Sequence, residues 1–175
     1  TLFLGAGSVM HGMNDELDMR RYGGLMKYMR ITALTFLAGY VAIIGLPPFS
    51  GWYTKDKIIE EAWAQGWVVG GIATFGAMLT AFYMTRIVAM TFFCKPRWQD
   101  DAHPHESPSL MTLPMIVLAI GSLVFGFVLS INNAFVDWLE PVTGLSEGHP
   151  VIPAALVEYG TLALVLVSVG LAWMQ

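Results

Sequence analysis

Lys55 and Asp56 are the residues in this chain best placed to do chemistry, because they follow directly on the run 45–54, GLPPFSGWYT. Pro47 and Pro48 cannot continue an α-helix, so an apolar helix must break just before the two charges. At membrane depth such a break is tolerated only beside protein or an aqueous cavity. Loss of water disfavours a charged lysine and a nearby carboxylate favours it, so moving the carboxylate can switch lysine protonation. A proton relay requires this property.

A simpler interpretation of the same charges stays open. Residues 31–51 are long enough to cross a bilayer by themselves. Lys55, Asp56 and Lys57 would then mark the membrane interface, where long side chains reach the water. Spacing alone slightly favours this interfacial interpretation over a relay.

Two further ionisable residues are candidates for proton transfer. His11 lies where the first apolar segment meets a polar loop, and a histidine titrates near neutral pH. Arg86 is the single charge within residues 67–93 and needs a partner or a cavity there. For both residues a structural role is the favoured interpretation, as an interfacial hydrogen-bonding group and as a paired cation respectively. Glu158, in the last apolar segment, is interpreted as facing the interface rather than carrying protons.

The sequence predicts neither a metal site nor a cofactor-binding site. His103, His105 and Glu106 lie close together, but the prolines among them favour a surface loop. Cys94 is the single cysteine, which excludes an intrachain disulfide and a cysteine-ligated iron–sulfur cluster. The chain also lacks a GxGxxG fingerprint and a phosphate loop. Any redox chemistry must therefore belong to other chains.

Membrane-spanning helices are the elements expected to position these residues. Of the 175 residues, 55% are hydrophobic and 13% are charged, about half the charged share of a soluble domain. Residues 32–54 and 110–134 contain no charge, as a bilayer core demands. We expect an all-α, polytopic transmembrane helix bundle with one broken helix at Pro47-Pro48. Its spans are predicted at about 1–13 (partial), 31–66 (broken), 67–93, 110–131 and 152–174.

The charges in the loops predict an orientation. Loops 14–30 and 94–109 hold several Lys and Arg residues, whereas loop 132–151 holds none. Short cytoplasmic loops retain such residues, so the first two loops are predicted on the cytoplasmic or matrix side. The net charge of −4 gives no basic surface for phosphate backbones, which argues against a nucleic-acid partner. The lipid bilayer is the expected environment.

Five motifs, in order along the chain, carry a resemblance to a known family. They are LFLGAGSV at 2–9, DMRRYGGL at 18–25, GLPPFSGWYTKD at 45–56, AFYMTR at 81–86 and HPHESP at 103–108. This series resembles the largest antiporter-like membrane subunit of proton-pumping NADH:quinone oxidoreductase, respiratory complex I. The resemblance covers about residues 1–109, and the last two spans agree only in length and spacing.

The resemblance implies a membrane subunit that translocates protons while other subunits pass electrons from NADH to quinone. Lys55 would carry the proton near the outlet of a half-channel, and Asp56 would tune it. The family's mid-channel lysine and histidine would lie upstream of Thr1, so we expect the C-terminal part of one antiporter-like domain in a longer chain. NADH, FMN, iron–sulfur clusters and quinone are implied in partner subunits, and an adjacent antiporter-like subunit is the implied neighbour.

Two other functions stay open beside this one. The HPHESP loop favours complex I, but a large subunit of a multisubunit sodium/proton antiporter shares the fold and is the main alternative. A purely structural membrane scaffold, with all its charges at interfaces, is the third possibility. The complex I interpretation places the chain in an energy-transducing membrane, either the bacterial plasma membrane or the mitochondrial inner membrane.

Overall fold

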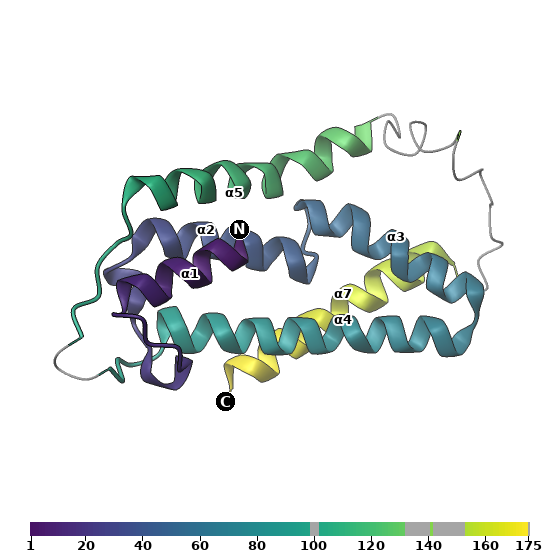
Figure 1. Cartoon of the computed structure of the whole chain (residues 1–175). Helices are drawn as coiled ribbons and strands as arrows, with labels where there is room; N and C mark the ends of the chain where they lie inside the picture. The colour runs from purple at the N-terminus through teal and green to yellow at the C-terminus, as the bar shows by residue number, and fades with distance from the viewer. Residues whose placement is uncertain (99–101, 132–140, 142–152, 175) are drawn as a thin grey trace.

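A computed structural model of the chain describes residues 1–98, 102–131, 141 and 153–174. Every regular element in these residues is helical, which confirms the predicted all-α bundle (Figure 1). The longer helices are α1 (Leu2–Gly12), α2 (Arg30–Ile44), α3 (Ser50–Gln65), α4 (Trp67–Val88), α5 (Ser109–Ser130) and α7 (Ala154–Trp173). Two 3-10 turns, η1 (Met19–Arg21) and η2 (Leu25–Lys27), precede α2, and a π-helical turn, η3 (Ala89–Phe93), extends α4.

The predicted break at Pro47-Pro48 is confirmed. α2 ends at Ile44, and Gly45 follows in the left-handed conformation with φ of 79°, which glycine adopts without strain and which commonly ends a helix. The Gly45 N–H donates to the Ala42 carbonyl and the Leu46 N–H to the Val41 carbonyl. Five residues, 45–49, then separate α2 from α3. The broken helix therefore consists of two half-helices with a short proline-containing link.

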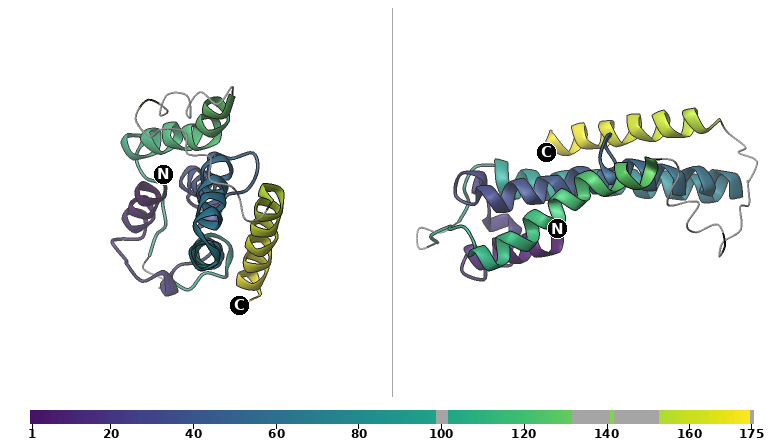
Figure 2. Two further views of the ribbon diagram at one scale, coloured as in Figure 1. Left: turned by 90° about the vertical axis from the view of Figure 1, so that its right-hand side faces the viewer. Right: turned by 90° about the horizontal axis from the view of Figure 1, so that it is seen from above.

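The helices on either side fix the position of this break. α3 and α4 are joined through Gly66 alone, so α4 turns back and runs beside α3 and then α2 (Figure 1). α5 packs against α2 and α3, whereas α7 packs against α4 and α3 (Figure 2). As a result, both halves of the broken helix pack against neighbours on several sides.

The main apolar core lies among α1, α2 and α4. Val9, Phe36 and Met84 are buried there, and the rings of Phe36 and Phe92 lie 5.4 Å apart. Gly5 permits the close approach of α1 to α2, because a Cβ at this position would lie 2.7 Å from the Phe36 ring. This core holds α2 against α1 and α4.

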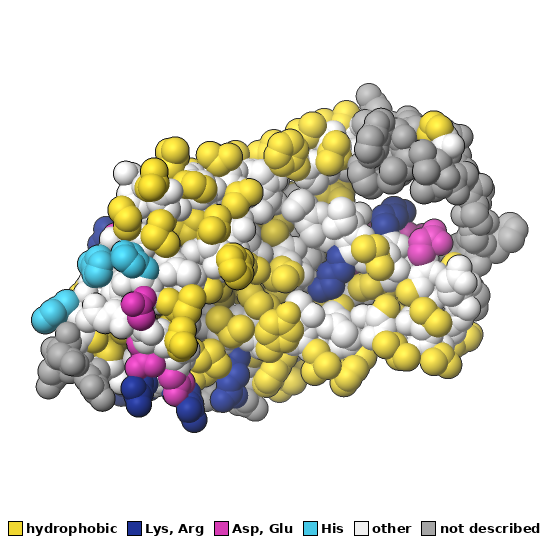
Figure 3. All heavy atoms as spheres, viewed as in Figure 1, with side chains coloured by type: hydrophobic (Ala, Val, Ile, Leu, Met, Phe, Trp, Pro, Cys, Tyr) yellow, Lys and Arg dark blue, Asp and Glu magenta, His cyan; other side chains and the backbone are white. Residues whose placement is uncertain are grey.

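The outer helices have the length and composition of membrane spans. Trp67–Phe93, Ser109–Ser130 and Ala155–Trp173 have mean hydropathies of 1.5, 2.3 and 1.9, high enough for a hydrocarbon environment. Figure 3 shows hydrophobic side chains over most of the visible face. Histidine and charged side chains gather at one end of that face, and a smaller charged group lies over α3. The fold is therefore that of a membrane helix bundle.

Loops 14–30 and 94–109 lie together at one end of the bundle. The Arg97 Nε donates to the Tyr22 carbonyl oxygen at 3.2 Å, and the rings of Tyr28 and Trp98 meet edge to face at 5.7 Å. Gly23, with φ of 135°, lies against the Lys95 carbonyl, where no Cβ would fit. The two basic loops thus share one end of the bundle, and the membrane side of that end stays a prediction.

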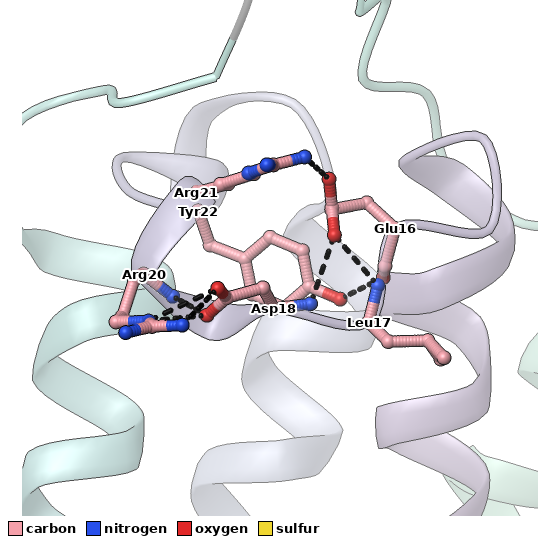
Figure 4. A network of polar contacts seen from close by, with 6 residues as sticks. All are labelled: Glu16, Leu17, Asp18, Arg20, Arg21 and Tyr22. Carbon is pink, nitrogen blue, oxygen red and sulfur yellow. Dashed lines mark hydrogen bonds and ion pairs between the residues drawn. The ribbon is translucent and has the colours of Figure 1, made fainter.

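The same end carries a network of ion pairs between η1 and the segment just before it (Figure 4). Arg20 donates to both carboxylate oxygens of Asp18, with Nη2 at 2.7 Å from Oδ2, and Arg21 Nη1 lies 2.8 Å from Glu16 Oε2. The Tyr22 hydroxyl donates to the Glu16 carbonyl oxygen. The Arg20 side chain and its backbone N–H lower the pKa of Asp18 to about 2. The backbone N–H of Asp18, followed by the Arg21 side chain, lowers the pKa of Glu16.

Candidate functional site

The break between α2 and α3 is closely packed because glycine lies at two contact points. Gly51, in the first turn of α3, presses against the Ala42 carbonyl in the last turn of α2, and a Cβ there would overlap that oxygen. Gly126 of α5 lies in the same way against the backbone of Ser50. The backbones of α2, α3 and α5 therefore meet at the break, and the first turn of α3 is held against the end of α2.

Lys55 reaches back from α3 to the carbonyl end of α2. Its half-buried side chain places Nζ 3.4 Å from both the Ile43 and the Ile44 carbonyl oxygens. These carbonyls belong to the last turn of α2, where backbone acceptors lack partners within the helix and the helix end carries partial negative charge. The ammonium group therefore lies at the helix terminus that favours a cation. Both distances are long for hydrogen bonds, so the interaction of the ammonium group with these carbonyls is mainly a charge–dipole attraction.

The helix bounds bear on whether Lys55 simply marks an interface. That interpretation needs residues 31–51 to cross the bilayer as one segment. α2 has 15 residues, about 22 Å of helix, against about 30 Å of hydrocarbon core. α3 continues from the break with several charged residues, so the depth of Lys55 in the membrane stays a prediction.

Asp56 follows Lys55 in the sequence, but its side chain has other neighbours than the end of α2 that Lys55 contacts. Its Oδ2 atom is buried and has no hydrogen-bond partner among the described residues. The carboxylate interacts electrostatically with Lys55 and with Glu158 of α7, and α7 packs against α3. Ile59, one turn further along α3, belongs to the same buried apolar cluster as Val157. Asp56 is thus a partly buried acid with an open oxygen between a lysine and a second acid.

A hollow opens at the same break, with a volume of about 470 Å³. The hydroxyl-bearing residues Ser50, Thr54 and Ser122 line it together with the start of α1 and the end of α2. The Ser122 hydroxyl donates to the Leu118 carbonyl at 3.0 Å, which leaves its oxygen able to accept. Hydroxyl groups in such a hollow can hydrogen-bond water, so the break offers a polar surface next to the half-helix that carries Lys55.

The other two candidate residues lie elsewhere. His11 ends α1 at the loop end of the bundle, where its exposed ring meets the ring of His105 edge to face at 5.9 Å. The start of α1 borders the hollow at the break, so His11 lies about 15 Å further along that helix. Arg86 is in the last turn of α4 with its side chain exposed. The structure brings Lys55, Asp56 and Glu158 together, and it places His11 at a separate region.

Sequence reasoning missed two features of the site. Nothing in the sequence indicated that Glu158, which was interpreted as facing the interface, is half-buried and interacts electrostatically with Asp56. The HPHESP segment was expected to be a surface loop, and while His103 and His105 are exposed, Glu106 and Ser107 turn inward onto α1 and α2. The available signal was the hydroxyl residues within otherwise apolar segments, Ser8 and Thr32, which need partners when buried.

Within residues 1–98, 102–131, 141 and 153–174, no three His, Cys, Asp or Glu side chains come close enough to hold a metal ion. The described site therefore consists of ionisable side chains, backbone carbonyls and hydroxyl groups. Such groups can bind and pass protons.

Comparison with known proteins finds relatives of this chain among subunits of NADH-quinone and NADH-ubiquinone oxidoreductase. Residues 1–80 match the family described as "NADH:quinone oxidoreductase/Mrp antiporter, TM". The chain is 49% identical to NADH-quinone oxidoreductase subunit L of Mycobacterium tuberculosis, over 98% of this chain and 28% of that protein. Identity to subunit L of Neisseria meningitidis is 37% over 94% of this chain and 28% of that protein. Identity to NADH-ubiquinone oxidoreductase chain 5 of Cryptococcus neoformans is 43%, over 73% of this chain and 20% of that protein. The chain thus spans less than a third of each relative.

Proposed function

Because this chain belongs to the family of antiporter-like membrane subunits that includes NADH-quinone oxidoreductase subunit L, we propose that it forms part of a proton-translocating subunit of complex I. In this proposal, electron transfer from NADH to quinone in other subunits supplies the energy. The chain contributes one section of the proton path, near its outlet. One observation carries the proposal: Lys55 lies at the carbonyl end of a broken helix and interacts electrostatically with Asp56, whose Oδ2 atom is buried without a described partner.

The geometry supports a simple proton step. While it is protonated, Lys55 is held by the Ile43 and Ile44 carbonyls. A proton that leaves Nζ passes to Asp56 through water, so that an N–H bond breaks at Lys55 and an O–H bond forms at Asp56. The open Oδ2 of Asp56 is an acceptor for that proton. Glu158 of α7 adds a second acidic side chain that interacts electrostatically with Asp56.

In this proposal, the cofactors and the neighbouring membrane subunits belong to the rest of the complex. NADH, FMN, iron–sulfur clusters and quinone are assigned to partner subunits, with the membrane subunits of complex I, above all an adjacent antiporter-like subunit, as neighbours. The end of the bundle that carries loops 14–30 and 94–109 is assigned to the cytoplasmic or matrix side. The concentration of Arg and Lys at that end supports this assignment.

A sodium/proton antiporter subunit is the second candidate function, because the matching family also includes Mrp antiporters. The relatives described above are subunits of NADH-quinone or NADH-ubiquinone oxidoreductase, which favours complex I. Measurements of proton transport distinguish the two functions. Sodium-dependent proton movement in vesicles without NADH would favour the antiporter, and NADH-driven proton movement that is independent of sodium favours complex I.

Replacement of Lys55 tests the proposed proton step in the assembled complex. We expect Lys55→Ala to lower the number of protons pumped per NADH oxidised, because the cation at the α2 terminus is lost. Lys57→Ala is the matched control, since Lys57 is two residues away, is 78% exposed and pairs with Glu60 at 3.0 Å. Pumping by Lys55→Ala at the level of Lys57→Ala, in a fully assembled complex, would remove the proton-carrying role of Lys55.

A further inference from the structure

Glu106 closes the N-terminal end of α2 from a distant loop. Its Oε2 accepts the Ile31 N–H at 2.8 Å, and its Oε1 accepts the Thr32 N–H at 3.3 Å and the Thr32 hydroxyl at 2.5 Å. The residue that precedes the helix, Met29, provides no side-chain cap. The first N–H groups of a helix lack partners within the helix, and a carboxylate there is favoured by the helix dipole. Glu106 therefore does the work of an N-cap residue 75 positions away in the sequence.

The loop that carries Glu106 is itself fixed to α1. The Ser107 hydroxyl lies 2.6 Å from the Ser8 hydroxyl and 3.2 Å from the Ser8 carbonyl oxygen, and the Ser8 hydroxyl lies 2.7 Å from that of Thr32. Ser8, Thr32 and Ser107 are all buried. Gly12 lies against the His105 carbonyl, where a Cβ would lie 2.6 Å from the oxygen. Glu106 is thus presented by a segment that cannot shift without breaking a buried network.

The two ends of α2 carry opposite ionic partners. The carboxylate of Glu106 binds the N–H end, and the ammonium group of Lys55 binds the carbonyl end. Each charge has the sign that the helix dipole favours at its terminus. Between them, α2 is a single uninterrupted helix of 15 residues, about 22 Å long. A movement of its N-terminal end is therefore transmitted along the rod to the carbonyls of Ile43 and Ile44.

We propose that Glu106 is a positioning residue for Lys55, which it controls through the placement of α2. Glu106 holds the N-terminal turn of α2 in register with α1, and this fixes the carbonyls at which Lys55 binds. When Glu106 is absent, the N–H groups of Ile31 and Thr32 lose their acceptors, and the N-terminal turn of α2 is held less firmly. The effect on transport rests on the proposed function, whereas the structural link between Glu106 and Lys55 does not.

Two substitutions of Glu106 test the link, and both are studied in the assembled complex. Glu106→Ala removes all the acceptor atoms, and Glu106→Gln keeps the shape and one acceptor oxygen but removes the charge. His103→Gln is the matched control, because His103 lies in the same loop with an exposed side chain. The first measurement is the distance from Lys55 Nζ to the Ile43 and Ile44 carbonyl oxygens in a cryo-electron microscopy structure of each variant.

The second measurement is the pH profile of proton pumping per NADH oxidised. When the C-terminal carbonyls of α2 are less ordered, they stabilise the ammonium form of Lys55 less. The pH on the alkaline side at which pumping falls to half should therefore be lower. Helix-terminus interactions of this kind correspond to a shift of about half a pH unit for Glu106→Ala. A smaller shift in the same direction is expected for Glu106→Gln, and none for His103→Gln. A general loss of stability would reduce the amplitude at all pH values without moving this half-point.

The outcomes separate this inference from the proposed function. Glu106 variants that retain both Lys55 contacts and the wild-type pH profile overturn the positioning role. If Glu106→Ala fails to assemble, the same criterion applies to Glu106→Gln. If Glu106→Ala lengthens the Lys55 contacts while Lys55→Ala pumps normally, the positioning role stands and the proton-carrying role of Lys55 falls. A lengthened contact together with a shifted profile supports both.

Discussion

The two charged regions of the molecule differ in how completely their charges are matched. At the loop end, Asp18 receives three bonds from the Arg20 side chain and one from its backbone, and Glu16 pairs with Arg21 at 2.8 Å. At the break, Lys55 has only two long contacts to carbonyls, and Asp56 has an oxygen without a partner in the described chain. Closely matched pairs stay ionised, whereas incompletely matched groups can change their protonation at little cost.

The largest expected effect is that of Asp56→Asn, which removes the proposed acceptor at the break and keeps the shape of the side chain. Because general acid–base groups contribute about a hundredfold or more, proton transfer through this subunit should become rate-limiting and pumping per NADH should fall sharply. Stopped-flow measurement of proton release from vesicles that contain the assembled complex gives the result.

Asp18→Asn is the control from the other region, since it removes an equivalent charge whose partners lie at the surface. We expect this variant to pump like the wild type. Equal losses of pumping in the two variants would mean that the incomplete pairing at the break has no special role, and the contrast between the two regions would lose its functional meaning.

A smaller effect is expected from Gly51→Ala, which tests whether close packing at the break positions Lys55. The added Cβ would overlap the Ala42 carbonyl oxygen, which belongs to backbone and cannot rotate away, so α3 must move off α2. Overpacking of this kind costs about 1–3 kcal/mol. The measurement is the midpoint of thermal unfolding of the assembled complex, which should fall.

Gly76→Ala is the control for the lower unfolding midpoint that is expected of Gly51→Ala. Gly76 is a glycine in the interior of α4, and a Cβ there meets nothing within 4 Å. Alanine is the better helix former, so Gly76→Ala should be neutral or slightly stabilising. If both substitutions were tolerated equally, the contact of α3 with the end of α2 could not be as tight as described.

The sequence was sufficient to predict the fold and the helix break beside which the candidate residues lie. The uncharged segments predicted the apolar helices, and Pro47 and Pro48 predicted the break because their effect on a helix is local. The role of the Ile43 and Ile44 carbonyls was not predictable, since Lys55 reaches them only after the chain has reversed at residues 45–49. A lysine near a proline pair does not reveal which backbone oxygens it will meet.

The partners of Glu106 and Asp56 were out of reach for the same reason. Glu106 caps a helix that begins 76 positions earlier at Arg30, and the interaction of Asp56 with Glu158 requires α7 to pack on α3. Capping is usually read from residues adjacent to the helix, and Met29 gives no such signal. Long-range packing, rather than any local pattern, decides which charges at the two regions find partners.

The smallest expected effect is at the loop end, where acid should release Asp18 from Arg20. The pKa of Asp18 in the folded chain, about 2, lies below the ordinary value of about 4, so the ionised carboxylate stabilises the fold. That contribution is complete above pH 4 and is lost as the pH falls through about 2. Carbon NMR of the Asp18 carboxyl group should therefore show a midpoint near pH 2 in the wild type.

Arg20→Ala should raise that midpoint toward about 4, because the side-chain bonds from Arg20 are the largest cause of the lowered pKa. Unfolding should change little between the two proteins at neutral pH, since exposed ion pairs contribute little to stability and the Arg20 side chain is 80% exposed. A midpoint that stays near 2 without Arg20 would show that the backbone N–H alone holds the carboxylate ionised. Either way, a carboxylate that titrates so far below neutral pH cannot exchange protons during turnover, which leaves the incompletely matched acid at the break, Asp56, as the better candidate for that role.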